Sequence, residues 1–173
     1  MYKRQHPPLL TEFGATTNQP VLRDMVARAQ EAMTGWQYWA YCGCDDPTTT
    51  GPGATQALVF NPAKPPVDDN VDWAKMRALV LPHPLSVSGT PTAYGFRRDG
   101  KVFHAVWSVA RAAANGDFAP GSRTRIAVPA FVYRKGYAAH VTGGRVVSRA
   151  DARTLVVAQG ENAKRVRVVV RPR

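Results

Sequence analysis

Residues 9–41 hold the feature that most constrains the fold, because an apolar segment, a helix pattern and an aromatic segment follow one another there. The apolar segment 9–14 predicts a short buried strand, and segment 36–41 predicts a second one from its aromatic enrichment. A strand–helix–strand unit of this length usually makes two neighbouring parallel strands. The stretch therefore predicts one parallel pair joined by a helix.

Helical spacing of the apolar residues in segment 21–33 predicts the connecting helix. Thr17 or Asn18 is expected to cap it, with Pro20 in its first turn and Gly35 as the C-cap. A second helix is expected over residues 71–81, with Asp69 or Asn70 as its cap.

The candidate functional residues lie in the two strands. Glu12 stands near the carboxyl end of the first, which in a parallel barrel is the end that carries catalytic groups. Strand alternation divides the second into two faces. One face holds Trp36, Tyr38 and Ala40, and the other holds Gln37, Trp39 and Tyr41.

Leu9-Leu10-Thr11-Glu12-Phe13-Gly14-Ala15-Thr16, followed by Gly35-Trp36-Gln37-Tyr38-Trp39-Ala40-Tyr41-Cys42-Gly43, resembles the end of the catalytic barrel in endoglycoceramidases of glycoside hydrolase family 5. The resemblance implies strands seven and eight of a (β/α)8 barrel. It implies that Glu12 is the nucleophile of a retaining β-glycosidase and that Trp39 is a sugar platform, with Tyr41 as a second substrate-binding residue. The implied reaction cleaves the linkage between glycan and ceramide in glycosphingolipids, without a cofactor. Steryl-glucoside and β-glucan hydrolases fit the same motifs.

The expected fold is α+β in two domains. A whole (β/α)8 barrel needs about 250 residues, whereas this chain has 173, so the barrel piece at residues 1–84 is expected to lack strands one to six. We therefore interpret the chain as a C-terminal fragment. Residues 82–91 are expected to be the domain junction, and residues 90–173 an antiparallel, immunoglobulin-like β-sandwich. In its last strand Val166, Val168 and Val170 alternate with Arg165, Arg167 and Arg171.

A retaining glycosidase needs a second carboxylate, which acts as acid and base. The family's acid/base is the Glu of an Asn-Glu pair, and no such pair occurs in this chain. The other glutamates are expected in an outer helix (Glu31) and in a sandwich turn (Glu161). We therefore expect no useful glycoside hydrolysis by this polypeptide alone.

The charge is unevenly distributed. Residues 1–89 hold 7 Lys+Arg and 8 Asp+Glu, whereas residues 90–173 hold 16 and 4, which gives −1 and +12. One hypothesis is a non-catalytic basic sandwich that binds anionic membrane or glycolipid surfaces. The alternatives are ordinary solvated charge from an arginine-rich genome, or a chain without a function of its own. Nucleic-acid binding is not expected, because aromatic residues do not alternate with the basic ones.

Metal binding is not expected either. Cys42 and Cys44 are too close to favour a disulfide between strand neighbours, and the four histidines are scattered. The first residues contain no signal-peptide pattern. Full-length relatives are expected to be secreted or at the cell surface, and the location of this chain stays open.

Overall fold

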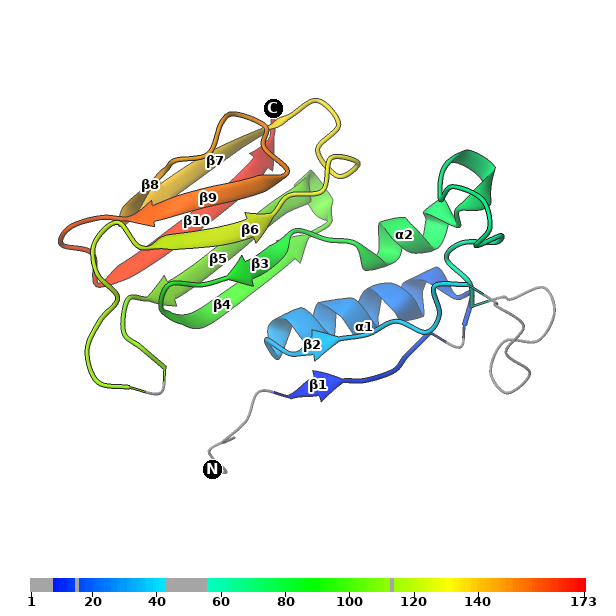
Figure 1. Ribbon diagram of the computed structural model, residues 1–173, viewed down its shortest axis with the longest axis horizontal. Coiled ribbons are helices and arrows are strands. Elements are labelled where there is room, and N and C mark those ends of the chain that lie inside the picture. The colour runs from blue at the N-terminus through cyan, green and yellow to red at the C-terminus, as the bar shows by residue number, and fades with distance from the viewer. Residues whose placement is uncertain (1–7, 15, 43–55, 113) are drawn as a thin grey trace. The chain divides into compact units, whose positions relative to one another are not determined.

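The computed structural model describes residues 8–14, 16–42, 56–112 and 114–173. It divides into two compact units, Met1–Val80 and Leu81–Arg173 (Figure 1). The division falls before the expected junction at residues 82–91. That expectation was wrong because His83–Ser86 forms strand β3, which pairs with a sandwich strand. Residues 81–84 therefore belong to the second unit.

The first unit contains the predicted parallel pair. Strands β1 (Leu9–Leu10) and β2 (Gly35–Trp36) pair Leu9 with Gly35 and Leu10 with Trp36. Helix α1 (Gln19–Glu31) connects them. Both strands are shorter than predicted, because the regular ladder is interrupted directly after Leu10. The two-strand parallel unit is confirmed, and its membership of a barrel stays a prediction.

Local sequence explains both ends of α1. The Val21 N–H donates to the Asn18 side chain at 3.3 Å, which confirms the predicted cap. The C-cap is Ala32, and Met33 follows it with a φ of 50°. The Met33 N–H donates to the Gln30 carbonyl and the Thr34 N–H to the Ala29 carbonyl, which is a Schellman motif. The prediction of Gly35 as C-cap was therefore wrong.

Helix α2 (Trp73–Leu79) packs against α1 and is shorter than the predicted segment 71–81. Its cap is Asp72, which accepts a 2.9 Å hydrogen bond from the Lys75 N–H. The expected caps were wrong because Asp68–Asn70 forms a separate 3₁₀ turn, η1. Trp73 is 38% exposed, while Lys75 is buried. None of the helices in the described ranges is long and apolar enough to cross a membrane.

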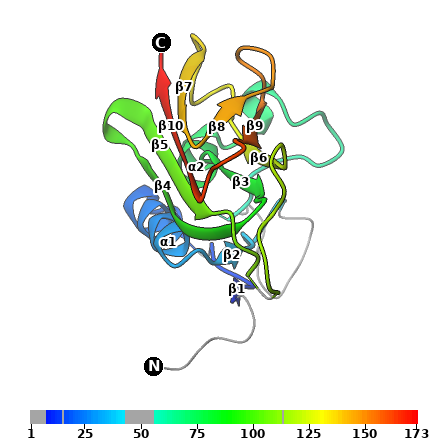
Figure 2. The same ribbon diagram turned by 90° about the vertical axis from the view of Figure 1, so that its left-hand side faces the viewer.

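The second unit is a sandwich of two four-stranded antiparallel sheets, seen as two layers in Figure 2. One sheet has the order β4-β5-β10-β7 and the other β3-β6-β9-β8. Their bounds, besides β3 (His83–Ser86), are β4 (Thr90–Arg97), β5 (Val102–Ser108), β6 (Arg123–Ala127), β7 (Tyr137–Thr142), β8 (Gly144–Val146), β9 (Thr154–Gln159) and β10 (Arg165–Pro172). The 3₁₀ turn η2 (Asp99–Lys101) joins β4 to β5.

Alternating residues of both sheets build the core. In β10, Val166, Val168 and Val170 are fully buried, while Arg165, Arg167 and Arg171 on the opposite face are exposed, as predicted. Phe103 of β5, Ile126 of β6 and Leu155 of β9 belong to the same cluster. The strand order is not the immunoglobulin one, in which the first two strands share a sheet. Here β3 and β4 lie in different sheets.

Candidate functional site

The chain around Glu12 contains an irregularity in the parallel pairing. The Gln37 N–H donates to the Leu10 carbonyl at 2.9 Å, and the Trp39 N–H donates to the Phe13 carbonyl at 2.8 Å. The donors are two positions apart in the sequence but the acceptors are three positions apart, so the first segment holds one extra residue, as in a β-bulge. Glu12 lies within this extra length and is exposed. Such bulges redirect a side chain and are over-represented beside active sites.

Aromatic packing fixes the second segment against the first. The Phe13 ring meets the rings of Trp36 and Tyr38 edge to face, with centroids 5.4 and 5.7 Å apart. These contacts place Trp36 and Tyr38 on the face of segment 36–41 that Phe13 covers. On the opposite face, Trp39 is 37% and Tyr41 is 56% exposed, which confirms the predicted alternation.

Gly14 allows the two segments to come this close. Its φ is 139°, in the region that side-chain-bearing residues rarely adopt. A Cβ at this position would lie 2.2 Å from the Trp39 carbonyl oxygen and 2.6 Å from the Tyr38 ring. The glycine two residues after Glu12 therefore sets how near the Glu12 segment lies to the Trp39 backbone.

The end of segment 36–41 is hydrogen-bonded to residues 56–59, which are called the returning segment below. The Val59 N–H donates to the Tyr41 carbonyl at 2.8 Å, and Cys42 forms a parallel bridge with Val59. Val59 in turn pairs with Val71, just before α2. The backbone of Tyr41 is thereby tied to the chain that leads into α2.

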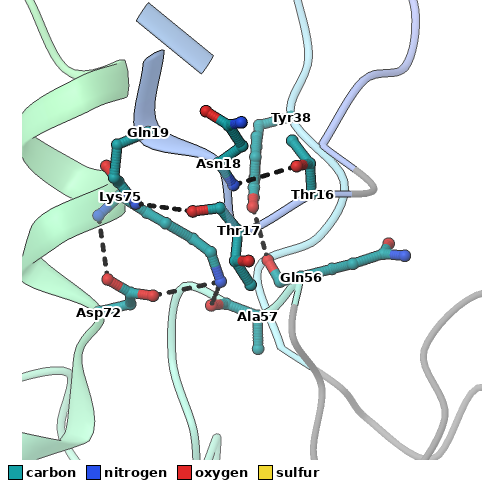
Figure 3. Close-up of polar contacts among 9 residues, drawn as sticks. All are labelled: Thr16, Thr17, Asn18, Gln19, Tyr38, Gln56, Ala57, Asp72 and Lys75. Carbon is teal, nitrogen blue, oxygen red and sulfur yellow. Dashed lines mark hydrogen bonds and ion pairs between the residues drawn. The ribbon is translucent and has the colours of Figure 1, made fainter. Parts of the chain in front are cut away.

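Polar side chains hold the start of this returning segment (Figure 3). The Tyr38 hydroxyl donates to the Gln56 carbonyl at 2.7 Å. The Lys75 ammonium donates to the Ala57 carbonyl at 3.3 Å and pairs with the Asp72 carboxylate at 3.1 Å. Burial, and after it the negative charge of Asp72, raises the pKa of Tyr38 to about 12. Tyr38 and Lys75 therefore fix two successive carbonyls of one segment.

Sequence reasoning missed Lys75, although a signal was present. Lys75 lies three and four residues before Ala78 and Leu79, so it shares their buried helix face. A lysine on the apolar face of a helix requires a partner, because an unpaired buried charge is costly. Asp72, one turn earlier on the same helix, is that partner.

The structure gives Glu12 no second glutamate to work with. Glu31 is exposed on α1 and pairs with Arg28 at 3.1 Å, while Glu161 lies in a turn of the second unit. Trp39 and Tyr41 occupy the segment beside that of Glu12, but their roles and that of Glu12 stay predictions.

No group of three potential metal ligands occurs among the residues that the structure describes. Cys42 is disulfide-bonded, against the expectation from spacing. That expectation assumed regular strand alternation, whereas Cys42 lies beyond β2 at an isolated bridge. Cys44 lies outside the described residues.

Comparisons with known proteins agree with these observations. Residues 82–170 match the glycoside hydrolase family 5 C-terminal domain. The chain is 32% identical over 170 residues to endoglycoceramidase I of Rhodococcus hoagii (strain 103S), a match that covers 94% of this chain and 27% of that protein. The chain thus spans about a quarter of the length of this curated relative.

Solved structures show the same similarity. The lactosyl-enzyme intermediate of endo-glycoceramidase II from a Rhodococcus species aligns with a TM-score of 0.61 and 26% identity, over 96% of this chain and 33% of that one. The ganglioside GM3 complex of that enzyme aligns with a TM-score of 0.64 and 21% identity, over 96% and 32%. Sterylglucosidase 1 of Cryptococcus neoformans shares the fold, with a TM-score of 0.66 and 13% identity over 96% and 29%. The chain therefore belongs to the endoglycoceramidase branch of glycoside hydrolase family 5 and carries that family's C-terminal domain.

Proposed function

We propose that the first unit, Met1–Val80, supplies strands seven and eight of a (β/α)8 glycosidase barrel, and that Glu12 is the nucleophile of a retaining β-glycosidase. The observation that carries the proposal is the bulged Glu12 segment, which is hydrogen-bonded to the segment that contains Trp39. The similarity to endoglycoceramidases supports the linkage between glycan and ceramide in glycosphingolipids as the bond cleaved.

The proposed chemistry assigns one role to each residue. The Glu12 carboxylate attacks the anomeric carbon and forms a glycosyl-enzyme, which water then hydrolyses. The exposed faces of Trp39 and Tyr41 stack on the apolar C–H face of the sugar. An acid/base carboxylate must stand about 5–5.5 Å from the nucleophile, and this chain offers no Asn-Glu pair for it. The chain by itself should therefore not turn over substrate.

Two assays test this proposal. The 173-residue chain, given lactosylceramide or an aryl β-glucoside, should release no more product than buffer. Turnover that Glu12→Gln abolishes would contradict the proposed inactivity. The second assay uses a complete barrel, made by placing the preceding residues of the Rhodococcus hoagii relative before this chain.

In that complete barrel, Glu12→Gln should lower the hydrolysis rate at least a thousandfold, because the covalent step is lost. Glu31→Gln is the matched control, since Glu31 is an exposed glutamate of the same unit and should leave the rate unchanged. Glu12→Gly with added azide should yield an α-glycosyl azide. An equal loss in both glutamine variants would remove Glu12 from the nucleophile role.

A second proposed function concerns the second unit, as a non-catalytic module that binds anionic membrane or glycolipid surfaces. It is supported by the +12 charge of residues 90–173, where 16 Lys+Arg stand against 4 Asp+Glu. We also propose a secreted or cell-surface location for full-length relatives. The disulfide at Cys42 supports it, because disulfides persist in oxidising compartments.

A further inference from the structure

The strands of the second unit carry basic side chains but no acidic ones. All four acidic residues of segment 90–173, namely Asp99, Asp117, Asp151 and Glu161, lie outside the eight strands. Two of them are ion-paired, Asp117 with Lys164 at 3.4 Å and Asp151 with Arg173 at 3.0 Å. The outer faces of the two sheets therefore present arginine without a neighbouring carboxylate on the same strands.

One of these outer faces is hollowed. A groove of about 590 Å³ lies across β7 and β10 and is lined by Arg167, Arg171, His140, Thr142, Val169 and alanines of β7. No Phe, Tyr or Trp side chain lines it, so it lacks the broad ring face that a sugar stacks on. Its polar lining is two guanidinium groups, an imidazole and a hydroxyl, all of which can donate hydrogen bonds to an oxyanion.

The sheet register places these groups around an apolar floor. Val169 is paired with His140 on β7 and with His104 on β5. Arg167 and Arg171 flank Val169 two positions to either side on the same face of β10. At about 3.4 Å per residue, their backbones stand roughly 14 Å apart. Both arginines are exposed, so their side chains can close on a ligand that lies over Val169.

The electrostatics of the neighbouring His104 agree with a cationic groove. Burial, and after it the charges of Arg167 and Arg97, lowers the pKa of His104. The charged groups on this outer face of the sheet are Arg97, Arg165, Arg167 and Arg171, and the titratable ones are His104 and His140. Each of these side chains carries either positive charge or none, so an anion entering the groove meets no repelling carboxylate from the four strands.

We propose that this groove binds the phosphate group of anionic phospholipids, so that the second unit docks on an anionic bilayer through Arg167 and Arg171. The inference rests on the second proposed function and assigns it to one face. Guanidinium groups match phosphate oxygens in a bidentate way, which favours this ligand chemistry. A bilayer is the occupant that fits, since the related Rhodococcus enzymes are named for glycolipid substrates, which reside in membranes.

The chain offers a charge-matched control on the opposite sheet. Arg123 and Arg125 lie on one strand, β6, and both are exposed on its outer face. The variants Arg167→Ala/Arg171→Ala and Arg123→Ala/Arg125→Ala each remove two positive charges and lower the net charge from +11 to +9. Binding of the full chain is measured by sedimentation with vesicles of phosphatidylcholine alone and of phosphatidylcholine with 30% phosphatidylglycerol.

The full chain should sediment with the vesicles that contain phosphatidylglycerol. With vesicles of phosphatidylcholine alone, it should stay in the supernatant. The groove variant should bind roughly thirtyfold more weakly, from the contribution of two arginines near an anionic surface. The control variant should lose less than about threefold, because its charges face away from the bilayer. Far-UV circular dichroism should be the same for all three proteins, since the four arginines are exposed.

Each other result overturns a defined part of the inference. Equal losses in the two variants would leave diffuse membrane attraction in place but remove the groove. Equal binding of the full chain to both kinds of vesicle, or to neither, would remove the second proposed function together with the groove. Inorganic phosphate is also titrated into the vesicle mixture at constant ionic strength. Displacement of the chain from the vesicles at micromolar phosphate would show that the groove is a site for free phosphate and not a docking site for a bilayer.

Discussion

The Trp39 N–H donates a 2.8 Å hydrogen bond to the carbonyl of Phe13, where a regular parallel ladder continuing from Leu10 would use the carbonyl of Glu12. The shift by one residue is what makes the Glu12 segment a bulge. It changes the direction of the Glu12 side chain relative to a regular strand. The candidate nucleophile is therefore positioned by a backbone feature that involves the candidate sugar platform itself.

Gly14→Ala should destabilise the first unit by about 3 kcal/mol, because the new Cβ would overlap the Trp39 carbonyl and the φ of 139° would be strained. Gly35→Ala is the control within the same unit, since its Cβ would meet only the Leu9 side chain, at 3.2 Å. Urea unfolding followed by tryptophan fluorescence measures both. Equal midpoints for the two variants would show that the close approach at Gly14 does not matter.

Lys75→Met should lower the free energy of unfolding of the first unit by about 2–3 kcal/mol. The substitution keeps the length of the buried side chain but leaves Asp72 without its cation and Ala57 without its donor. Lys64→Met makes the same chemical change at an exposed position and should cost under about 0.5 kcal/mol. Thermal unfolding of both variants checks this, and a neutral Lys75→Met would show that the cluster does not support the segment.

Tyr38 should ionise near pH 12, about two units above an ordinary tyrosine. Because the unfolded chain releases this proton first, the free energy of unfolding should be unaffected below about pH 10 and should fall as the pH rises towards 12. Absorbance at 295 nm after a rapid pH jump measures the ionisation. The difference between the wild type and Tyr38→Phe should contain the component near pH 12, and a component near pH 10 would contradict the burial of Tyr38.

The pKa of His104 should rise in Arg167→Ala, because one of the two cations that lower it is removed. It should stay below its ordinary value, since burial remains the larger cause. NMR titration of the imidazole resonance measures this, with Arg125→Ala on the other sheet as a control that changes nothing. The unfolded chain binds this proton at higher pH, so its protonation lowers stability as the pH falls through about 6.5.

The sequence predicted those parts of the fold that depend on local pattern. The alternation of valine and arginine in β10 gave the buried and exposed faces correctly. Asn18 and Pro20 gave the start of α1. The aromatic face of segment 36–41 was also right, because Phe13 packs on Trp36 and Tyr38 as a strand neighbour would.

Features that depend on hydrogen-bond register or on competition between signals could not be predicted. Helix α1 ends at Glu31, with Ala32 as its C-cap, because Met33 adopts the left-handed conformation, although Gly35 was the better candidate by residue type. Strand β3 contains Pro84 and resembles a linker in composition, yet it pairs with β6. The bulge at Glu12 requires knowing which carbonyl Trp39 uses, which no residue type reveals.

The sequence named the residues of the candidate site, but it did not predict most of the contacts that surround them. Glu12, Trp39 and Tyr41 were identified from motifs, and the structure brings their two segments together. The supporting contacts of Tyr38 and Lys75 were not foreseen, because they join residues 18 positions apart in the sequence. The catalytic roles themselves stay predictions until the Glu12 variants are assayed.

The edges of the sandwich bear on self-association. Pro84 and Pro91 lie in the edge strands β3 and β4, each next to a register shift, and the edge strand β8 has three residues. Proline, irregularity and shortness each hinder the addition of a foreign strand. The fourth edge, β7 (Tyr137–Thr142), has six residues, regular pairing and no proline. Any fibre or dimer that this sandwich forms by strand addition should therefore grow from β7. A charged substitution that hinders self-association at high protein concentration belongs on that strand.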